Sequence, residues 1–102
     1  MNAYELREPA GSITVSPAAL TQIVVQAAEL ADGARVRRPK RGLAFEVDDG
    51  RAQVSIELVA RFGTVLPDLA REVQERVSGA LEGMCGLVVA AVDVSVEELE
   101  DR

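Results

Sequence analysis

The sequence predicts an α+β fold, a two-layer sandwich in which two helices cover one face of a mixed four-stranded sheet. Three observations support this prediction. Two segments carry apolar residues at helical spacing, and four segments are β-branched or alternate between apolar and polar residues. Their order along the chain is strand, helix, strand, strand, helix, strand. That order is the β-α-β-β-α-β arrangement, in which both helices pack on the same side of one sheet.

The chain of 102 residues is long enough for one domain and one core. Residues 1–10 are polar and are expected to form a flexible N-terminal arm. Residues 11–96 are expected to form a single domain, and residues 97–102 an acidic tail that frays. Within the domain, the segment SITV at 12–15 is β-branched and is predicted to be a strand whose Ile13 points inward.

The first helix is predicted to begin at Ser16-Pro17. Serine is a good N-cap, and proline at the first helical position gives up no hydrogen bond that the helix needs. We expect Asp32-Gly33 to end it, since glycine suits the left-handed residue that follows a helix. The apolar stripe of this helix comprises Leu20, Ile23, Val24, Ala27 and Ala31.

A β-hairpin is predicted around Asp49-Gly50, because both residues tolerate the positive φ angles of a type I′ turn. The first strand places Leu43, Phe45 and Val47 on its buried face. The return strand alternates for longer, and its buried face comprises Ala52, Val54, Ile56, Leu58, Ala60 and Phe62.

The second helix is predicted to begin near Pro67 and to end at Gly83 or Gly86. Its apolar stripe comprises Leu66, Leu69, Val73, Val77, Ala80, Leu81 and Met84. The last strand runs over 87–96, with its inward face formed by Val88, Ala90, Val92, Val94 and Val96.

Charge is unevenly distributed along the chain. Residues 33–42 carry a formal charge of +5, although the whole chain carries −6. The acidic remainder argues against a general nucleic-acid binder. The basic segment is interpreted either as a solvated loop or as a contact for an anionic partner, and Pro39 disfavours a regular strand there. Its candidate partner-binding residues are Arg35, Arg37, Arg38, Lys40 and Arg41.

A second candidate surface lies on the last strand, which is apolar on both faces in its first half. If the helices cover one face, Leu87, Val89 and Ala91 are left on the other. Exposed apolar area of this kind often marks an interface, so self-association through the open sheet face is one hypothesis. The alternative is that the strand is central and shielded by its neighbours.

Composition excludes several classes of function. The chain has no histidine and one cysteine, which rules out zinc sites and histidine-dependent triads. No nucleophile has a base beside it in a known motif, and Cys85 is interpreted as a packing residue. We therefore expect no enzyme activity, no metal and no cofactor. The N-terminus lacks the pattern of a secretory signal, so a cytoplasmic location is expected.

Several motifs resemble the alkaline-shock-protein family of bacterial envelope stress response proteins. The most specific is the long strand that ends in Arg61-Phe62-Gly63, followed by the helix that opens with PDLAREVQ. The others are the segment Met84-Cys85-Gly86-Leu87 and the valine-rich strand after it. The resemblance covers residues 11–96. The basic stretch at 34–41 departs from it, because the family often has a Gly-Val-rich turn at this point.

The resemblance implies a small, non-enzymatic protein of cell-envelope stress response or homeostasis. Such a protein acts by self-association and by binding protein partners near the membrane, at the periphery of its inner face. An alternative is a regulatory partner of an enzyme of lipid or fatty-acid metabolism. Weak contact with anionic lipid and RNA binding through the basic segment are further hypotheses. RNA binding is the weaker of these, because the basic segment contains no aromatic residue on which a base would stack.

Overall fold

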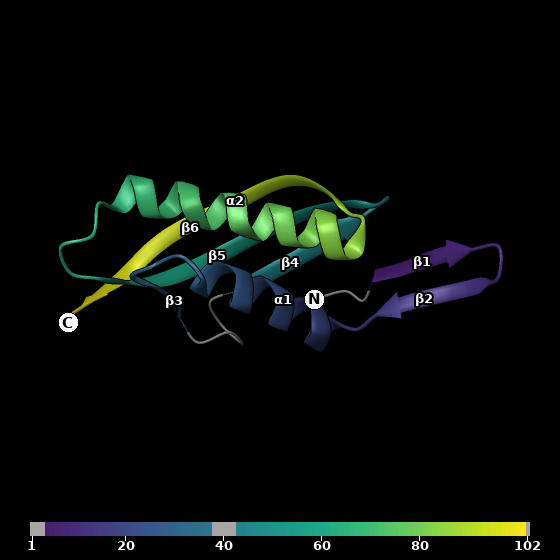
Figure 1. The fold of residues 1–102 in the computed structure, drawn as a ribbon, viewed down its shortest axis with the longest axis horizontal. Helices are drawn as coiled ribbons and strands as arrows, with labels where there is room; N and C mark the ends of the chain where they lie inside the picture. The colour runs from purple at the N-terminus through teal and green to yellow at the C-terminus, as the bar shows by residue number, and fades with distance from the viewer. Residues whose placement is uncertain (1–3, 38–42, 102) are drawn as a thin grey trace.

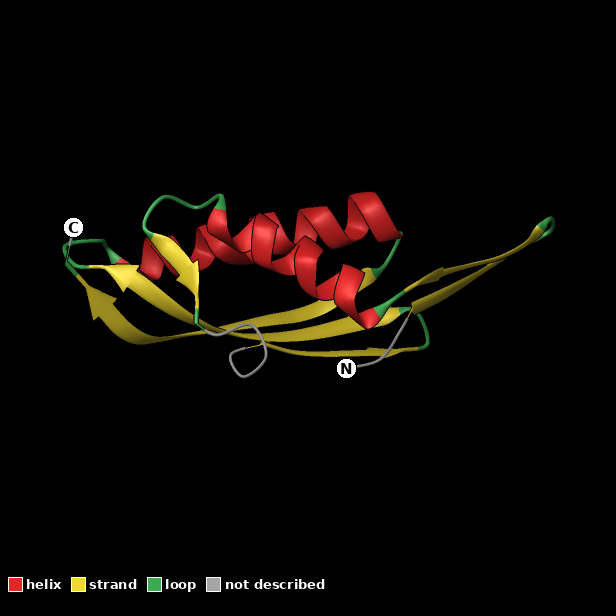
Figure 2. Cartoon of the chain, turned by 90° about the horizontal axis from the view of Figure 1, so that it is seen from below, coloured by secondary structure: helices red, strands yellow, loops and turns green. Residues whose placement is uncertain are grey.

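The computed structural model describes residues 4–37 and 43–101, and it has the predicted two-layer α+β architecture. Both helices lie on one face of the four-stranded sheet (Figures 1 and 2). The elements in chain order are β1 (Tyr4–Glu8), β2 (Gly11–Val15), α1 (Pro17–Glu29), β3 (Ala34–Val36), β4 (Leu43–Asp48), β5 (Arg51–Arg61), α2 (Leu66–Cys85) and β6 (Val88–Glu100).

The long strand β5 is the centre of this sheet. It pairs in parallel with β6 over its whole length. It pairs antiparallel with β4 through residues 51–56 and with β3 through residues 58–60. Because a strand has two edges, β3 and β4 share the edge opposite β6. The sheet is therefore mixed, and α2 is the crossover that joins the parallel strands β5 and β6.

The position of the first predicted strand is corrected. Residues 11–15 form β2, which pairs with β1 in a separate two-stranded sheet rather than joining β5. Ile13 is 53% exposed instead of pointing into the core. The described part of the expected arm is thus a strand, because Tyr4 pairs with Val15 and the ladder continues to Glu8 and Gly11. The fourth strand of the main sheet is β3, in a stretch that was expected to be a loop.

The predicted signals at the hairpin turn, the start of α1 and the end of α2 are present, whereas α1 ends at Glu29 and not at the predicted Asp32-Gly33. Asp49 and Gly50 have φ angles of 52° and 73°, as a type I′ turn requires. The hydroxyl of Ser16 accepts a hydrogen bond of 3.1 Å from the backbone N–H of Ala19, so it caps α1 as predicted. Gly86 follows α2 with a φ of 69°, the left-handed conformation that ends many helices.

The core lies between the helices and the sheet. The inward residues of β5 are buried from Ala52 to Ala60 as the alternation predicts. Phe62 is the exception at 65% exposed, because β5 ends at Arg61 and a turn follows. The stripe of α2 is buried at Leu69, Val73, Val77 and Leu81, whereas Met84 is 70% exposed. Cys85 takes the corresponding position in the core, as its packing interpretation requires.

Candidate interaction surfaces

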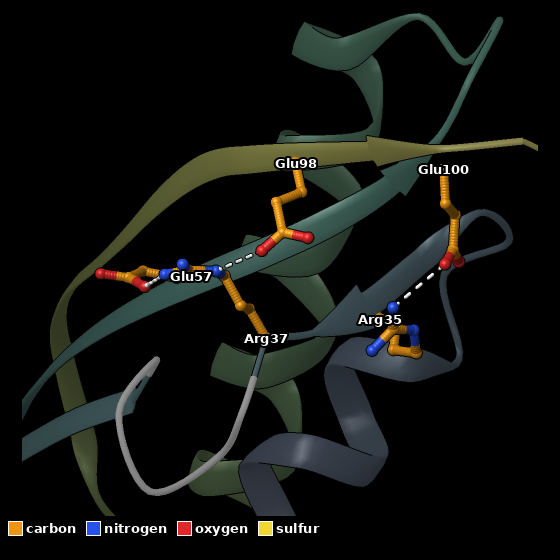
Figure 3. A network of polar contacts seen from close by, with 5 residues as sticks. All are labelled: Arg35, Arg37, Glu57, Glu98 and Glu100. Atoms are coloured by element: carbon orange, nitrogen blue, oxygen red, sulfur yellow. Dashed lines mark hydrogen bonds and ion pairs between the residues drawn. The ribbon is translucent and has the colours of Figure 1, made fainter.

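The face of the sheet that the helices leave open carries a network of ion pairs at its β3 end. The guanidinium of Arg35 donates to Glu100 at 3.0 Å. Arg37 donates to two carboxylates, with Nε 2.7 Å from Glu98 and Nη1 2.8 Å from Glu57. Figure 3 shows that this network connects β3 with β5 and β6. The acidic residues 98 and 100, which were expected in a fraying tail, therefore extend β6 instead.

These hydrogen bonds and charges raise the pKa of both arginines above its ordinary value. For Arg35 the main cause is the hydrogen bond to Glu100, and for Arg37 it is the hydrogen bond to Glu98, followed by that to Glu57. Beside them Val59 is only 3% exposed although it lies on the open face, opposite Arg35 in the ladder. Long arginine stems commonly shield apolar surface in this way.

A hollow of about 710 Å³ lies next to this network, and its charged groups are already engaged. Arg35, Arg37 and Glu98 belong to the network. Glu29 accepts a hydrogen bond of 2.9 Å from the backbone N–H of Val36. The hollow is thus lined by groups that neutralise one another rather than by charges that await a ligand.

The structure therefore changes how the predicted basic surface is understood. Two of its five candidates, Arg35 and Arg37, bind carboxylates of the same chain. The other three, Arg38, Lys40 and Arg41, lie outside the described residues. The sequence could not reveal the pairing, because the partners are separated by 61 and 65 residues along the chain.

The second predicted surface, on the last strand, is corrected at two of its three residues. Leu87 is 2% exposed and Val89 packs against the core. Ala91 pairs with Gln53 in the ladder and is half-buried. Val88, which was expected to point inward, is 54% exposed.

Two local features explain this difference. The N–H of Gly86 donates to the carbonyl of Glu82 four residues earlier, as in the αL motif that ends helices, and the N–H of Leu87 donates to the carbonyl of Leu81. This motif brings the apolar residue after the glycine against the end of the helix. A register shift then leaves Ala90 without an opposite residue, between Val89 and Ala91. The extra residue reverses the inward and outward alternation, so the predicted pattern holds only from Val92 onward.

The outer surface of the helices carries a groove that the sequence analysis did not predict. It lies between α1 and α2, has a volume of about 540 Å³, and contains no charged side chain. Leu30 and Met84 in its lining are 67% and 70% exposed. The sequence signal that could have indicated this groove was Met84, which lies at the edge of the predicted apolar stripe of α2. The lining residues are Ala19, Gln22, Ile23, Gln26, Ala27, Leu30, Ala80 and Met84.

The described residues offer little for catalysis or metal binding. Within 4–37 and 43–101, no group of three histidine, cysteine or carboxylate side chains is placed to hold a metal ion. Burial raises the pKa of the Cys85 thiol, which disfavours the reactive thiolate. No described helix combines the length and apolar character needed to cross a membrane.

The profile of the alkaline shock protein family, which is described as having a cell envelope-related function, matches residues 30–100. This chain belongs to that family. The match spans β3 to β6 and α2, and it thus includes the ion-pair network and all four strands of the main sheet. A search of curated proteins found no match.

Solved structures of the MamM CTD share the fold of this alkaline shock protein family member. A double variant is 23% identical with a TM-score of 0.57, over 81% of this chain and 94% of that one. A cadmium form is 24% identical with a TM-score of 0.57, over 81% and 96%. A zinc form is 20% identical with a TM-score of 0.51, over 83% and 85%. At this identity the similarity concerns the fold alone.

Proposed function

We propose that this alkaline shock protein family member is a non-catalytic interaction protein in envelope stress response or envelope homeostasis. It acts by self-association and by binding protein partners at the periphery of the membrane. The observation that carries this proposal is the family match over residues 30–100, with its cell envelope-related description.

The character of the surface supports an interaction role. The groove between the helices is apolar and uncharged, as the centre of a protein interface is. The network of Arg35 and Arg37 is neutralised within the chain, which weakens the case for RNA or anionic lipid as the main partner of these two residues. Arg38, Lys40 and Arg41 remain the basic candidates for a partner contact.

Affinity capture from native cells tests the proposal. The tagged wild-type protein is compared with a variant in which Arg38, Lys40 and Arg41 are replaced by glutamine. We expect the wild type to enrich envelope-associated proteins together with untagged copies of itself. If the basic segment makes the contact, the variant loses the partner, and thermal unfolding of both proteins checks that the fold is kept.

The matched control replaces Arg35 and Arg37 by glutamine. This control removes the same kind of charge but breaks the network, so we expect it to loosen the end of β6. A single metabolic enzyme as the only captured protein would favour the regulatory alternative instead. Enrichment of neither envelope proteins nor the protein itself would contradict the proposal.

A further inference from the structure

The hairpin formed by β1 and β2 is the most unusual feature of the molecule. It projects from one end of the body along the long axis, and the molecule measures 50 × 22 × 18 Å (Figures 1 and 2). The ladder contains five residue pairs, from Tyr4–Val15 to Glu8–Gly11. Two-stranded hairpins are only marginally stable in water unless another element packs on them. Tyr4 belongs to the core and Leu6 and Val15 pack against it, so Ile13 is the apolar side chain of this hairpin that is left exposed.

One face of the hairpin is apolar at the two residue pairs nearest the body, and Glu8 lies on the same face at the tip. Because side chains alternate along a strand, Tyr4 and Leu6 share a face with their partners Val15 and Ile13. Exposure rises along this face, from 8% at Tyr4 in the core to 53% at Ile13. The opposite face is polar: Glu5 and Arg7 form an ion pair of 3.5 Å on it, next to Thr14 and Ser12.

The groove between α1 and α2 matches this face in chemistry and position. The lining of the groove carries no charged side chain, and the Leu6–Ile13 pair of the hairpin is aliphatic, with Glu8 beyond it at the tip. Figure 1 shows that the start of α1 and the end of α2 lie at the end of the body from which the hairpin projects. The hairpin of the same chain extends away from its own groove (Figure 2), so that hairpin does not fill it. A second copy supplies both missing surfaces at once.

We propose that two copies exchange these hairpins, so that Ile13 of each copy packs into the groove between α1 and α2 of the other. The contact is reciprocal, as expected for a closed two-fold dimer. It covers the exposed Ile13 of one copy together with the exposed Met84 and Leu30 of the other. This inference rests on the self-association in the proposed function and names the surfaces that carry it.

Sedimentation velocity over a concentration series tests the exchange. Ile13→Glu and Met84→Glu place a charge on either side of the contact, and each is expected to weaken self-association on the order of tenfold or more. Ser12→Glu is the matched control, because it adds the same charge to the same strand on the polar face, opposite Arg7. Unchanged association in both test variants would overturn the inference.

Paramagnetic relaxation locates the contact directly. A nitroxide is attached to Thr14→Cys in a Cys85→Ala chain, which is mixed with an isotope-labelled chain that carries no nitroxide. Because the isotope-labelled chain carries no nitroxide, its signals broaden only when the nitroxide of another copy lies close to them. We expect broadening at Ile23 and Leu30 of the groove, none at Val65 at the other end, and loss of the effect when Ile13→Glu is added to the nitroxide chain.

The outcomes separate this inference from the proposed function. If the protein self-associates but the broadening lies elsewhere, the hairpin exchange is wrong and the proposed function stands. If the protein is monomeric at the highest concentration, both the exchange and self-association are wrong. Partner binding is then still measured by the capture experiment.

Discussion

Asp32 shows how a single exposed carboxylate responds to its environment. It accepts a hydrogen bond of 2.8 Å from Arg61, and this bond, with the charge of the same arginine, lowers its pKa below the ordinary value of 3.8. The backbone N–H of Arg61 also donates to Gly33 at 2.9 Å, so the pair lies beside the turn that leads into β3.

A lowered pKa in the folded state makes stability depend on pH. The contribution of Asp32 is present above its unfolded pKa and is lost as the pH falls through the folded value. We expect Asp32→Asn to lower the stability at neutral pH and to reduce the loss of stability on acidification below about pH 4. Urea unfolding at a series of pH values measures this. An unchanged pH profile in the variant would contradict the role of the pair.

Leu87 and Val88 are neighbours with opposite environments, at 2% and 54% exposure. We expect Leu87→Ala to destabilise the fold by about 2–5 kcal/mol, because it leaves a cavity where the chain turns back from α2 against the core. Val88→Ala is the control and is expected to cost less than about 0.5 kcal/mol. Chemical denaturation measures both. A larger effect of Val88→Ala than of Leu87→Ala would show that the alternation of the sequence, rather than the shifted register, describes this strand.

The elements that local signals define were predictable from the sequence. Ser16 caps α1, Asp49 and Gly50 make the turn, and β5 alternates from Ala52 to Ala60. Each of these depends on residues close together in the chain. The placement of β2 was not predictable in this way, because strand pairing is a choice among distant partners. The alternation of Tyr4 and Leu6 with polar neighbours was a signal for β1, but it did not indicate which strand β1 would join.

The candidate site was predictable only as a set of residue types. The sequence singled out Arg35 and Arg37 by their charge, but the ion pairs that they form depend on carboxylates of β6 that lie far along the chain. The prediction of which residues of the last strand point inward was wrong before Val92. The cause is the extra residue Ala90 in the ladder, and a stretch that is apolar throughout gives no sign of such a residue.

The link between β3 and β6 gives a prediction at the level of whole elements. Replacing Glu98 by glutamine removes the main charge partner of Arg37 and is expected to raise amide hydrogen exchange at the end of β6. Amide hydrogen exchange over α2 should stay the same in this variant. Glu97→Gln is the control, because Glu97 is exposed and falls at the register shift between Val96 and Glu98. Equal exchange in both variants would mean that the ion pairs do not hold the strand.

At the scale of the molecule, the fold combines a closed core with two unsatisfied apolar surfaces. The sheet and helices bury their facing sides, while the hairpin and the groove present apolar residues outward. Exposed apolar surfaces of this kind often mark interfaces, which supports the proposed self-association. The same molecule carries a net charge of −6, which favours solubility of the free form.

We propose that this protein works by contact with other chains, and co-capture of two differently tagged copies from one cell is the decisive measurement. Each tag is expected to recover the other copy together with envelope proteins, and Ile13→Glu in both copies is expected to reduce recovery of the second copy greatly. Contact as the mode of action is wrong if neither tag recovers the other copy and no envelope protein is enriched.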